Sequence, residues 1–203
     1  INNPNNIFVK RFQPGHYYSP TPNLEELNQD KKRIFDRKLK DLKGVNFNDK
    51  KQLANFTQFI KYFKEFPYKK TNTKNTKLRY HPNNGSYDLG DAITLYSMIR
   101  IARPKRIIEV GSGYSSCFTL DVNEQFFDNK IDCTFIEPYP EQLLKLKKQN
   151  DSIKLYASRI QDVKLSIFTK LEKNDILFID STHVSEVGSD VNYNLFNISE
   201  GFY

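Results

Sequence analysis

The feature that most constrains the fold is a short apolar run at residues 106–110 that leads into a glycine turn and then a helical segment. The turn contains Gly111 and Gly113, which let the backbone approach a ligand closely and adopt a positive φ. The first turn of the following helix offers free N–H groups. A strand, a glycine turn and a helix in this order predict a nucleotide-like cofactor at the carboxyl edge of a parallel sheet.

The rest of the C-terminal part alternates between short apolar runs and helical segments. Successive residues in these runs are apolar, so the side chains on both faces of each strand would be buried. This suits a parallel sheet covered on both faces, and the predicted fold is α/β and Rossmann-like. Strands are expected at residues 106–110, 133–136, 153–157 and 175–179, and helices at 115–127, 141–149, 163–171 and 190–198.

The N-terminal part has a different texture. Helices are expected at residues 24–42, 50–66 and 89–102, and the polar residues 67–86 indicate a linker. We therefore predict a basic helical arm or lid at residues 1–80 and a Rossmann-like core at residues 81–203.

Charge divides the chain at the same place. Residues 1–80 hold 18 Lys and Arg against 7 Asp and Glu, a net charge of +11, whereas residues 81–203 hold 13 against 17, a net charge of −4. One interpretation is a surface for an anionic partner such as nucleic acid, a phosphorylated sugar or a lipid head group. The other is an exposed face rich in lysine, which the alternation of acids and bases at residues 25–43 favours.

Composition excludes several classes of protein. With 203 residues, the chain is long enough for one α/β domain and a small appendage. No run approaches the roughly 18 apolar residues of a membrane span, and no secretory leader is recognisable. Cys117 and Cys133 are the only cysteines, which excludes a four-cysteine zinc site and argues against a disulfide framework. A cytoplasmic location is expected.

The residues around the glycine turn narrow the choice of cofactor. A dinucleotide fingerprint requires a third glycine, but Ser116 stands there, and Glu109 precedes the turn. A carboxylate would repel a pyrophosphate, whereas it suits S-adenosylmethionine, which carries a sulfonium and an ammonium group. Glu137, 24 residues after Gly113, stands at the end of the next strand, where a carboxylate accepts hydrogen bonds from both ribose hydroxyls.

With these residues the chain resembles the class I S-adenosylmethionine-dependent methyltransferases. Their pattern, an acid, G-x-G and a second acid, is matched by Glu109, Gly111, Gly113 and Glu137. The segments at residues 18–20, 91–92, 109–113, 135–140 and 178–183 are similar to a bacterial subgroup associated with surface-polysaccharide or secondary-metabolite genes. The resemblance implies a cofactor site formed by Glu109, Gly111, Ser112, Gly113, Tyr114, Ser115, Glu137, Pro138, Gln161 and Asp162.

The end of the fourth predicted strand, Asp180-Ser181-Thr182-His183, is where this family meets its substrate. The segment lacks the Asp-Pro-Pro-Tyr pattern of base amino-methylation, which argues against DNA N-methylation. In one interpretation, His183 is a general base that takes the proton of a substrate hydroxyl. In the other, Asp180 is the first ligand of a divalent metal such as magnesium, and the metal acidifies the substrate hydroxyl. A loop-packing role for His183 stays open.

The expected function is methyl transfer to a hydroxyl or amine of a small molecule or sugar. Tyr18, Tyr87 and Asp91 are candidates for contact with this acceptor, and ordinary packing of the arm on the core is the alternative. Two other functions remain: an RNA methyltransferase that uses the basic arm, and a non-catalytic cofactor-binding scaffold. A dehydrogenase is disfavoured by Glu109 and Ser116. Because the family usually has seven strands, the core is expected to be truncated after strand four, with an open edge that favours oligomers.

Overall fold

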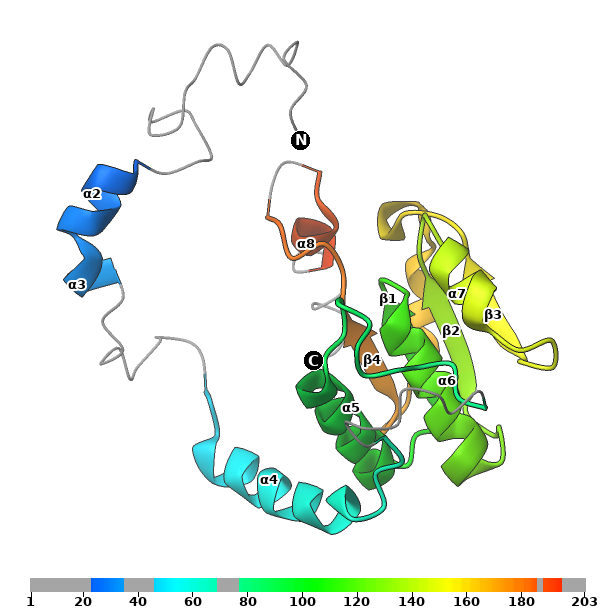
Figure 1. Cartoon of the computed structure of the whole chain (residues 1–203). Coiled ribbons are helices and arrows are strands. Elements are labelled where there is room, and N and C mark those ends of the chain that lie inside the picture. Colours follow the sequence, from blue (N-terminus) through cyan, green and yellow to red (C-terminus); the bar gives the residue numbers. More distant parts are fainter. Residues whose placement is uncertain (1–22, 35–45, 69–76, 186–187, 195–203) are drawn as a thin grey trace. The chain divides into compact units, whose positions relative to one another are not determined.

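A four-stranded parallel sheet forms the centre of the fold (Figure 1). Strands β1 (Arg106–Val110), β2 (Asp132–Ile136), β3 (Ile153–Tyr156) and β4 (Ile176–Ile179) lie in the order β3-β2-β1-β4. The chain therefore adds β2 and β3 on one side of β1 and then returns to add β4 on the other side. The α/β, Rossmann-like fold predicted from the sequence is confirmed.

The computed structural model describes residues 23–34, 46–68, 77–185 and 188–194. It divides into two compact units, Ile1–Asp49 and Lys50–Tyr203, and the sheet belongs to the second. The boundary inferred from composition stood at residue 80, so the structure assigns thirty-one more residues to the unit that holds the sheet.

The strands lie within one residue of their expected bounds. β1 is the expected strand, and four of its five residues are buried because its neighbours β2 and β4 pair with both of its edges. β4 begins one residue late, at Ile176, because the Asp175 carboxylate accepts hydrogen bonds from the backbone N–H groups of Lys105 and Arg106 at 3.0 and 2.9 Å. Asp175 thus closes the start of β1 against the start of β4.

The helices around the sheet follow the sequence less closely. Helix α5 (Leu89–Ala102) has the expected bounds, α6 (Tyr114–Phe127) begins one residue early, and α7 (Glu141–Leu146) ends three residues early. The helix expected at residues 163–171 is wrong: the chain forms two 3-10 helices, η1 (Ile160–Asp162) and η2 (Leu165–Lys170). The last helix, α8, covers Asp190–Tyr193, and residues 195–198 of its expected range lie outside the described part.

The N-terminal helices are shorter than the pattern suggested. The long helix expected at residues 24–42 is replaced, where it is described, by α2 (Leu24–Gln29) and α3 (Lys31–Ile34), separated at Asp30. Its residues 35–42 lie outside the described part. Helix α4 spans Asp49–Phe63. In the parts of the chain that the structure describes, no helix has the length and apolar character that a membrane span requires.

The segment at residues 67–86, expected as a linker, is partly a core element, so this expectation is wrong for its described residues. Tyr68, Arg79 and Tyr80 are buried. The rings of Tyr68 and Tyr80 pack on Phe118 of α6, with centroids 5.3 and 5.1 Å away. This packing explains why the second unit begins well before residue 81.

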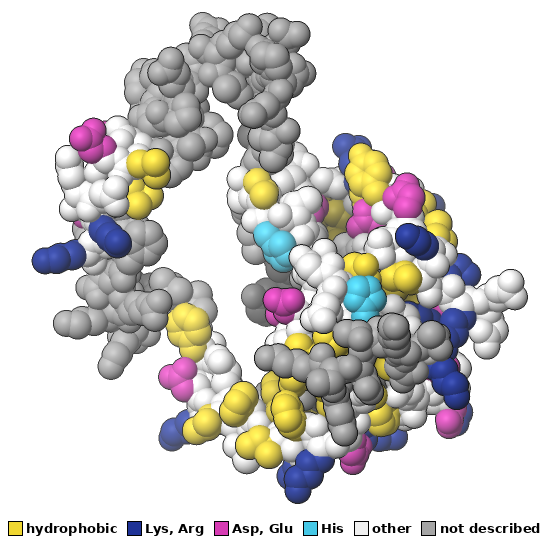
Figure 2. Space-filling model, viewed as in Figure 1, with side chains coloured by type: hydrophobic (Ala, Val, Ile, Leu, Met, Phe, Trp, Pro, Cys, Tyr) yellow, Lys and Arg dark blue, Asp and Glu magenta, His cyan; other side chains and the backbone are white. Residues whose placement is uncertain are grey.

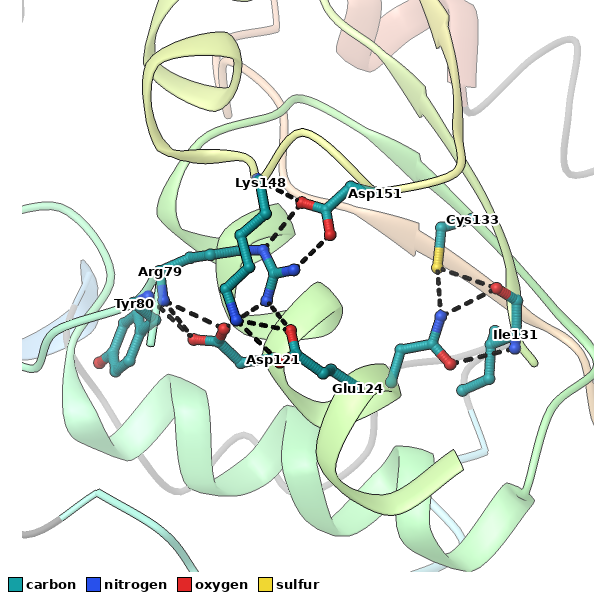
Figure 3. A network of polar contacts seen from close by, with 9 residues as sticks. Arg79, Tyr80, Asp121, Glu124, Ile131, Cys133, Lys148 and Asp151 are labelled. Carbon is teal, nitrogen blue, oxygen red and sulfur yellow. Dashed lines mark hydrogen bonds and ion pairs between the residues drawn. The ribbon is translucent and has the colours of Figure 1, made fainter. Parts of the chain in front are cut away.

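A buried ion-pair network fixes this segment to α6 (Figure 3). The Arg79 guanidinium donates to Asp121 and Glu124 of α6, each at 2.8 Å, and forms a two-point ion pair with Asp151. Asp121 also accepts hydrogen bonds from the N–H groups of Arg79 and Tyr80. Lys148 Nζ also donates to Glu124, at 2.8 and 2.7 Å from its two carboxylate oxygens. Because each buried charge has an opposite partner, the network tolerates its removal from water.

Candidate functional site

A cavity of about 740 Å³ opens at the carboxyl edge of the sheet. This volume lies within the roughly 300–1,000 Å³ that small-molecule sites occupy. The cavity adjoins the point beside β1 where the strand order reverses, which is where open α/β sheets bind ligands. Its walls are formed by residues Ser86, Tyr87, Val110 to Ser115, Ile136 to Tyr139, Arg159 to Gln161, Asp180 to Thr182, Val184, Ser189 and Asp190. All the predicted cofactor residues except Glu109 and Asp162 are among them.

The glycine turn is wedged between the ends of β2 and β4. The N–H of Gly111 donates to the Ile136 carbonyl at 3.0 Å, and the N–H of Asp180 donates to the Val110 carbonyl at 2.8 Å. Gly111 has φ +84°, and a Cβ there would lie 1.9 Å from the backbone oxygen of Asp180. Gly113, in contrast, faces open space, since a Cβ there would meet no atom within 4 Å. Gly111 therefore permits the close packing of the turn, and Gly113 leaves room in the cavity.

Glu109 lies behind this turn and is fully buried. Its Oε1 accepts hydrogen bonds from the hydroxyls of Ser115 and Ser116 at 2.6 and 2.9 Å. Its Oε2 is buried with no hydrogen-bond partner among the described residues. Burial raises the pKa of Glu109 to about 8, although the two serine hydroxyls act to lower it. Glu109 therefore keeps its proton at neutral pH unless a cation binds beside it.

Glu137 follows β2 and supports the turn from the other side. Its Oε2 accepts a hydrogen bond from the N–H of Ser112 at 3.0 Å, and its Oε1 accepts one from the N–H of Tyr139 at 2.8 Å. The sequence did not indicate this structural role. Each carboxylate oxygen has a further lone pair, and Glu137 lines the cavity, so it remains able to accept from ligand hydroxyls.

The two candidates near the expected adenine site differ. Gln161 lines the cavity, donates from Nε2 to the Gly188 carbonyl at 2.9 Å, and leaves its buried Oε1 without a partner among the described residues. Asp162 does not line the cavity. Its carboxylate is instead bonded to Arg159 Nε at 2.9 Å, and this hydrogen bond lowers the pKa of Asp162. The geometry therefore favours Gln161 over Asp162 as a ligand-binding residue.

Asp180 and His183 come together after β4. His183 Nε2 lies 3.3 Å from Asp180 Oδ1, and Asp180 lines the cavity whereas His183 is exposed beside it. The second acid of this loop, Asp190, accepts hydrogen bonds from the N–H and hydroxyl of Thr182. Among the described residues no group of three or more His, Cys, Asp or Glu could hold a metal ion, so the structure gives Asp180 no partners for a metal site there.

The candidates for acceptor contact also separate. Tyr87 lines the cavity, and burial, with the nearby charges of Glu109 and Asp180, raises the pKa of its hydroxyl. Asp91 does not line the cavity; its carboxylate accepts a hydrogen bond from the N–H of Asp88 and so caps α5. Asp91 is therefore a helix-capping residue in this structure. Tyr18 lies outside the described residues.

Some cavity residues gave no usable signal in the sequence. Ser86 lies in the segment expected to be a linker, and Arg159 precedes a 3-10 helix that the periodicity did not reveal. Tyr139 also lines the cavity and was not predicted. Because it directly follows Glu137-Pro138, its position beside the second acid could have identified it.

The charges around the cavity are unequal. Three acids, Glu137, Asp180 and Asp190, line it, while Arg159 is the only basic residue among the described lining residues. Arg159 is itself paired with Asp162. The cavity therefore favours a ligand that carries positive charge over one that carries phosphates.

Fold and site together define an α/β protein with a Rossmann-like parallel sheet and an acidic cavity at its switch point. No family model matches the chain, and no solved structure matches it. A protein of Archaeoglobus fulgidus, described as an uncharacterized protein, is 39% identical over 171 residues, which cover 82% of this chain and 76% of that protein. The chain belongs to the same family as this protein.

Proposed function

We propose that the chain is an S-adenosylmethionine-dependent methyltransferase that acts on a hydroxyl or amine of a small molecule or sugar. The observation that carries this proposal is the gathering of Glu109, Glu137 and Asp180 around a glycine turn at the switch point of the sheet. An acidic site of this kind favours a cationic cofactor and disfavours both a dinucleotide pyrophosphate and a polyanionic RNA acceptor.

The residues present fit this cofactor. Gly113 leaves open space beside the turn, Glu137 retains lone pairs for ribose hydroxyls, and Gln161 Oε1 is an unused buried acceptor. Glu109 keeps its proton up to a pKa of about 8, and a cationic group bound beside it would favour the loss of that proton. When bound, S-adenosylmethionine supplies an electrophilic methyl group on a sulfonium.

The chain's own contribution to the reaction would be positioning and proton removal. The walls of the cavity would hold an acceptor in place beside the methyl group, and such positioning lowers the entropic part of the barrier. His183 lies 3.3 Å from Asp180, at the rim of the cavity. In this arrangement His183 would take the proton of an acceptor hydroxyl, and Asp180 would stabilise the resulting imidazolium.

Calorimetric titration tests the cofactor directly. The full chain is titrated with S-adenosylmethionine and, separately, with NAD, and micromolar binding of the first is expected. Glu137→Gln, which keeps one acceptor oxygen, should weaken this binding about tenfold. The matched control is Asp132→Asn, an acid at the opposite end of β2 whose partner is the exposed Lys154. It should bind like the wild type.

The outcomes separate the alternatives. Binding of NAD without S-adenosylmethionine would replace the proposal with a dehydrogenase, and binding of neither would refute the cofactor assignment. Binding without methyl transfer to any of a panel of hydroxyl and amine acceptors would indicate a scaffold. In a transfer assay His183→Ala should lose most of the activity while it keeps the cofactor affinity of the wild type.

A further inference from the structure

Helix α4 carries an exposed apolar stripe that the candidate site does not use. Leu53, Phe56, Ile60 and Phe63 are each 59–67% exposed. Their spacing of three, four and three residues places them on one face of the helix. Figure 2 shows hydrophobic side chains along this part of the surface.

A different face of α4 packs on the core. The Tyr62 ring meets Tyr96 of α5 edge-on, with centroids 6.5 Å apart, and Phe66, just after the helix, packs on the same ring at 5.3 Å. The helix is thus anchored through its C-terminal end. Since these contacts use other residues, the exposed stripe is not needed to hold α4 in place.

Lysines border the stripe. At about 100° per residue, Lys64, Lys50 and Lys61 follow next to it on the solvent side. The acids of this region are fewer, Asp49 and Glu65, and Glu65 is paired with Arg100. An exposed stripe of Phe, Leu and Ile with lysines along its border is the pattern of a helix that lies in the plane of a membrane surface. Lysine side chains in this position reach the head groups while their methylene stems cover the apolar boundary.

We propose that α4 docks the protein on the surface of an anionic lipid bilayer. Leu53, Phe56, Ile60 and Phe63 enter the boundary between head groups and acyl chains, and the bordering lysines bind anionic head groups. Binding of this kind combines buried apolar area with electrostatic attraction, so it depends on both sets of residues.

A second copy of the chain fits the stripe less well. The spacing would allow antiparallel pairing of Leu53 with Phe63 and of Phe56 with Ile60, but it would also bring Lys50 near Lys64 of the other copy. Charge therefore favours the lipid surface.

Vesicle flotation tests the proposal with the full chain. Vesicles of phosphatidylcholine alone are compared with vesicles that also hold about 30% phosphatidylserine, at about 0.1 M salt. The protein should float with the anionic vesicles, bind the neutral ones at least about tenfold less, and be released as salt rises to about 0.5 M.

Two pairs of variants separate the apolar and the electrostatic contributions. Phe56→Ser with Phe63→Ser should lower the partition to anionic vesicles at least about tenfold. The control, Leu144→Ser with Leu165→Ser, removes two other exposed apolar side chains and should bind like the wild type. Lys50→Gln with Lys64→Gln should weaken binding about tenfold, whereas Lys145→Gln with Lys173→Gln should not.

Unfolding curves identify any variant that fails to fold, and the exposed positions of α4 should leave them unchanged. The proposal is overturned if the wild type does not float with anionic vesicles, or if the phenylalanine variant floats as well as its control. It is also overturned if the wild type sediments as a dimer without lipid and the phenylalanine variant as a monomer, since the stripe would then be a self-association face.

Discussion

Adding one methyl group at Gly111 or at Gly113 should have different consequences, although the two glycines belong to the same turn. A Cβ at Gly111 would lie 1.9 Å from the backbone oxygen of Asp180 and 2.6 Å from its carbonyl carbon. These are backbone atoms at the end of β4, so they cannot turn aside as a flexible side chain can. A Cβ at Gly113 would meet no atom within 4 Å.

The expected magnitudes follow from these contacts. Gly111→Ala places alanine at φ +84°, which costs roughly 1–2 kcal/mol. The displacement of Asp180 adds roughly 1–3 kcal/mol, and the lower entropy of the unfolded chain returns roughly 0.4–1 kcal/mol. The free energy of unfolding should therefore fall by about 2–4 kcal/mol. Gly113→Ala has neither cost, so its free energy of unfolding should stay within about 1 kcal/mol of the wild type.

Urea unfolding followed by circular dichroism measures both variants, and calorimetric titration with S-adenosylmethionine measures the cavity. The methyl group of Gly113→Ala would project into open space beside the turn, so ligand affinity should fall about tenfold without loss of stability. An unfolding free energy of Gly111→Ala within about 1 kcal/mol of the wild type would refute the wedged turn. An equal loss of stability in Gly113→Ala would show that the turn excludes any side chain, whatever its contacts.

Three further predictions concern buried groups. Asp121→Asn should lower the free energy of unfolding by about 3 kcal/mol or more, because it removes one charged partner of the buried Arg79 guanidinium. In the same urea assay, the control Asp132→Asn removes an exposed ion pair and should cost less than about 1 kcal/mol. As pH rises from about 4.5 to about 8, Glu109 ionises in the unfolded chain but keeps its proton in the fold, so the free energy of unfolding falls. Glu109→Gln has no such titration. Its free energy of unfolding, measured with urea across that range, should rise relative to the wild type by up to about 1.4 kcal/mol per pH unit. Burial raises the pKa of the Cys117 and Cys133 thiols to about 12, so at pH 8 a thiol reagent should label neither in the native protein and both in urea, and rapid native labelling would contradict their burial.

The sheet could be predicted from the sequence because its strands are short apolar runs bounded by polar or glycine residues. The start of β4 shifts by one residue because the Asp175 side chain bonds the backbone of β1. The segment before α5 could not be predicted in the same way. A charged residue such as Arg79 suggests a surface position. Its burial depends on ion pairs with acids that lie 42, 45 and 72 residues away along the chain. No local pattern contains that information.

The candidate site shows the same division between local and distant causes. Gly111, Glu137 and Asp180 follow the ends of three neighbouring strands, so the fold alone brings them to one edge. Asp162 and Asp91 have the expected residue type but bond to groups close in the sequence instead. Asp162 accepts a hydrogen bond from Arg159, and Asp91 caps α5. Sequence reasoning locates acids near a site more reliably than it determines which acids face the cavity.

Helix α6 links the buried network to the cavity. Its first turn presents Ser115, which lines the cavity and holds Glu109, and further along the same helix Asp121 binds the backbone of Arg79 and Tyr80. The segment that begins at Arg79 continues to Tyr87, which also lines the cavity. Contacts between apolar side chains would hold that segment as strongly, but such contacts are not directional. The directional bonds to Asp121 instead fix the register of the segment, so one helix sets the positions of both the glycine turn and Tyr87.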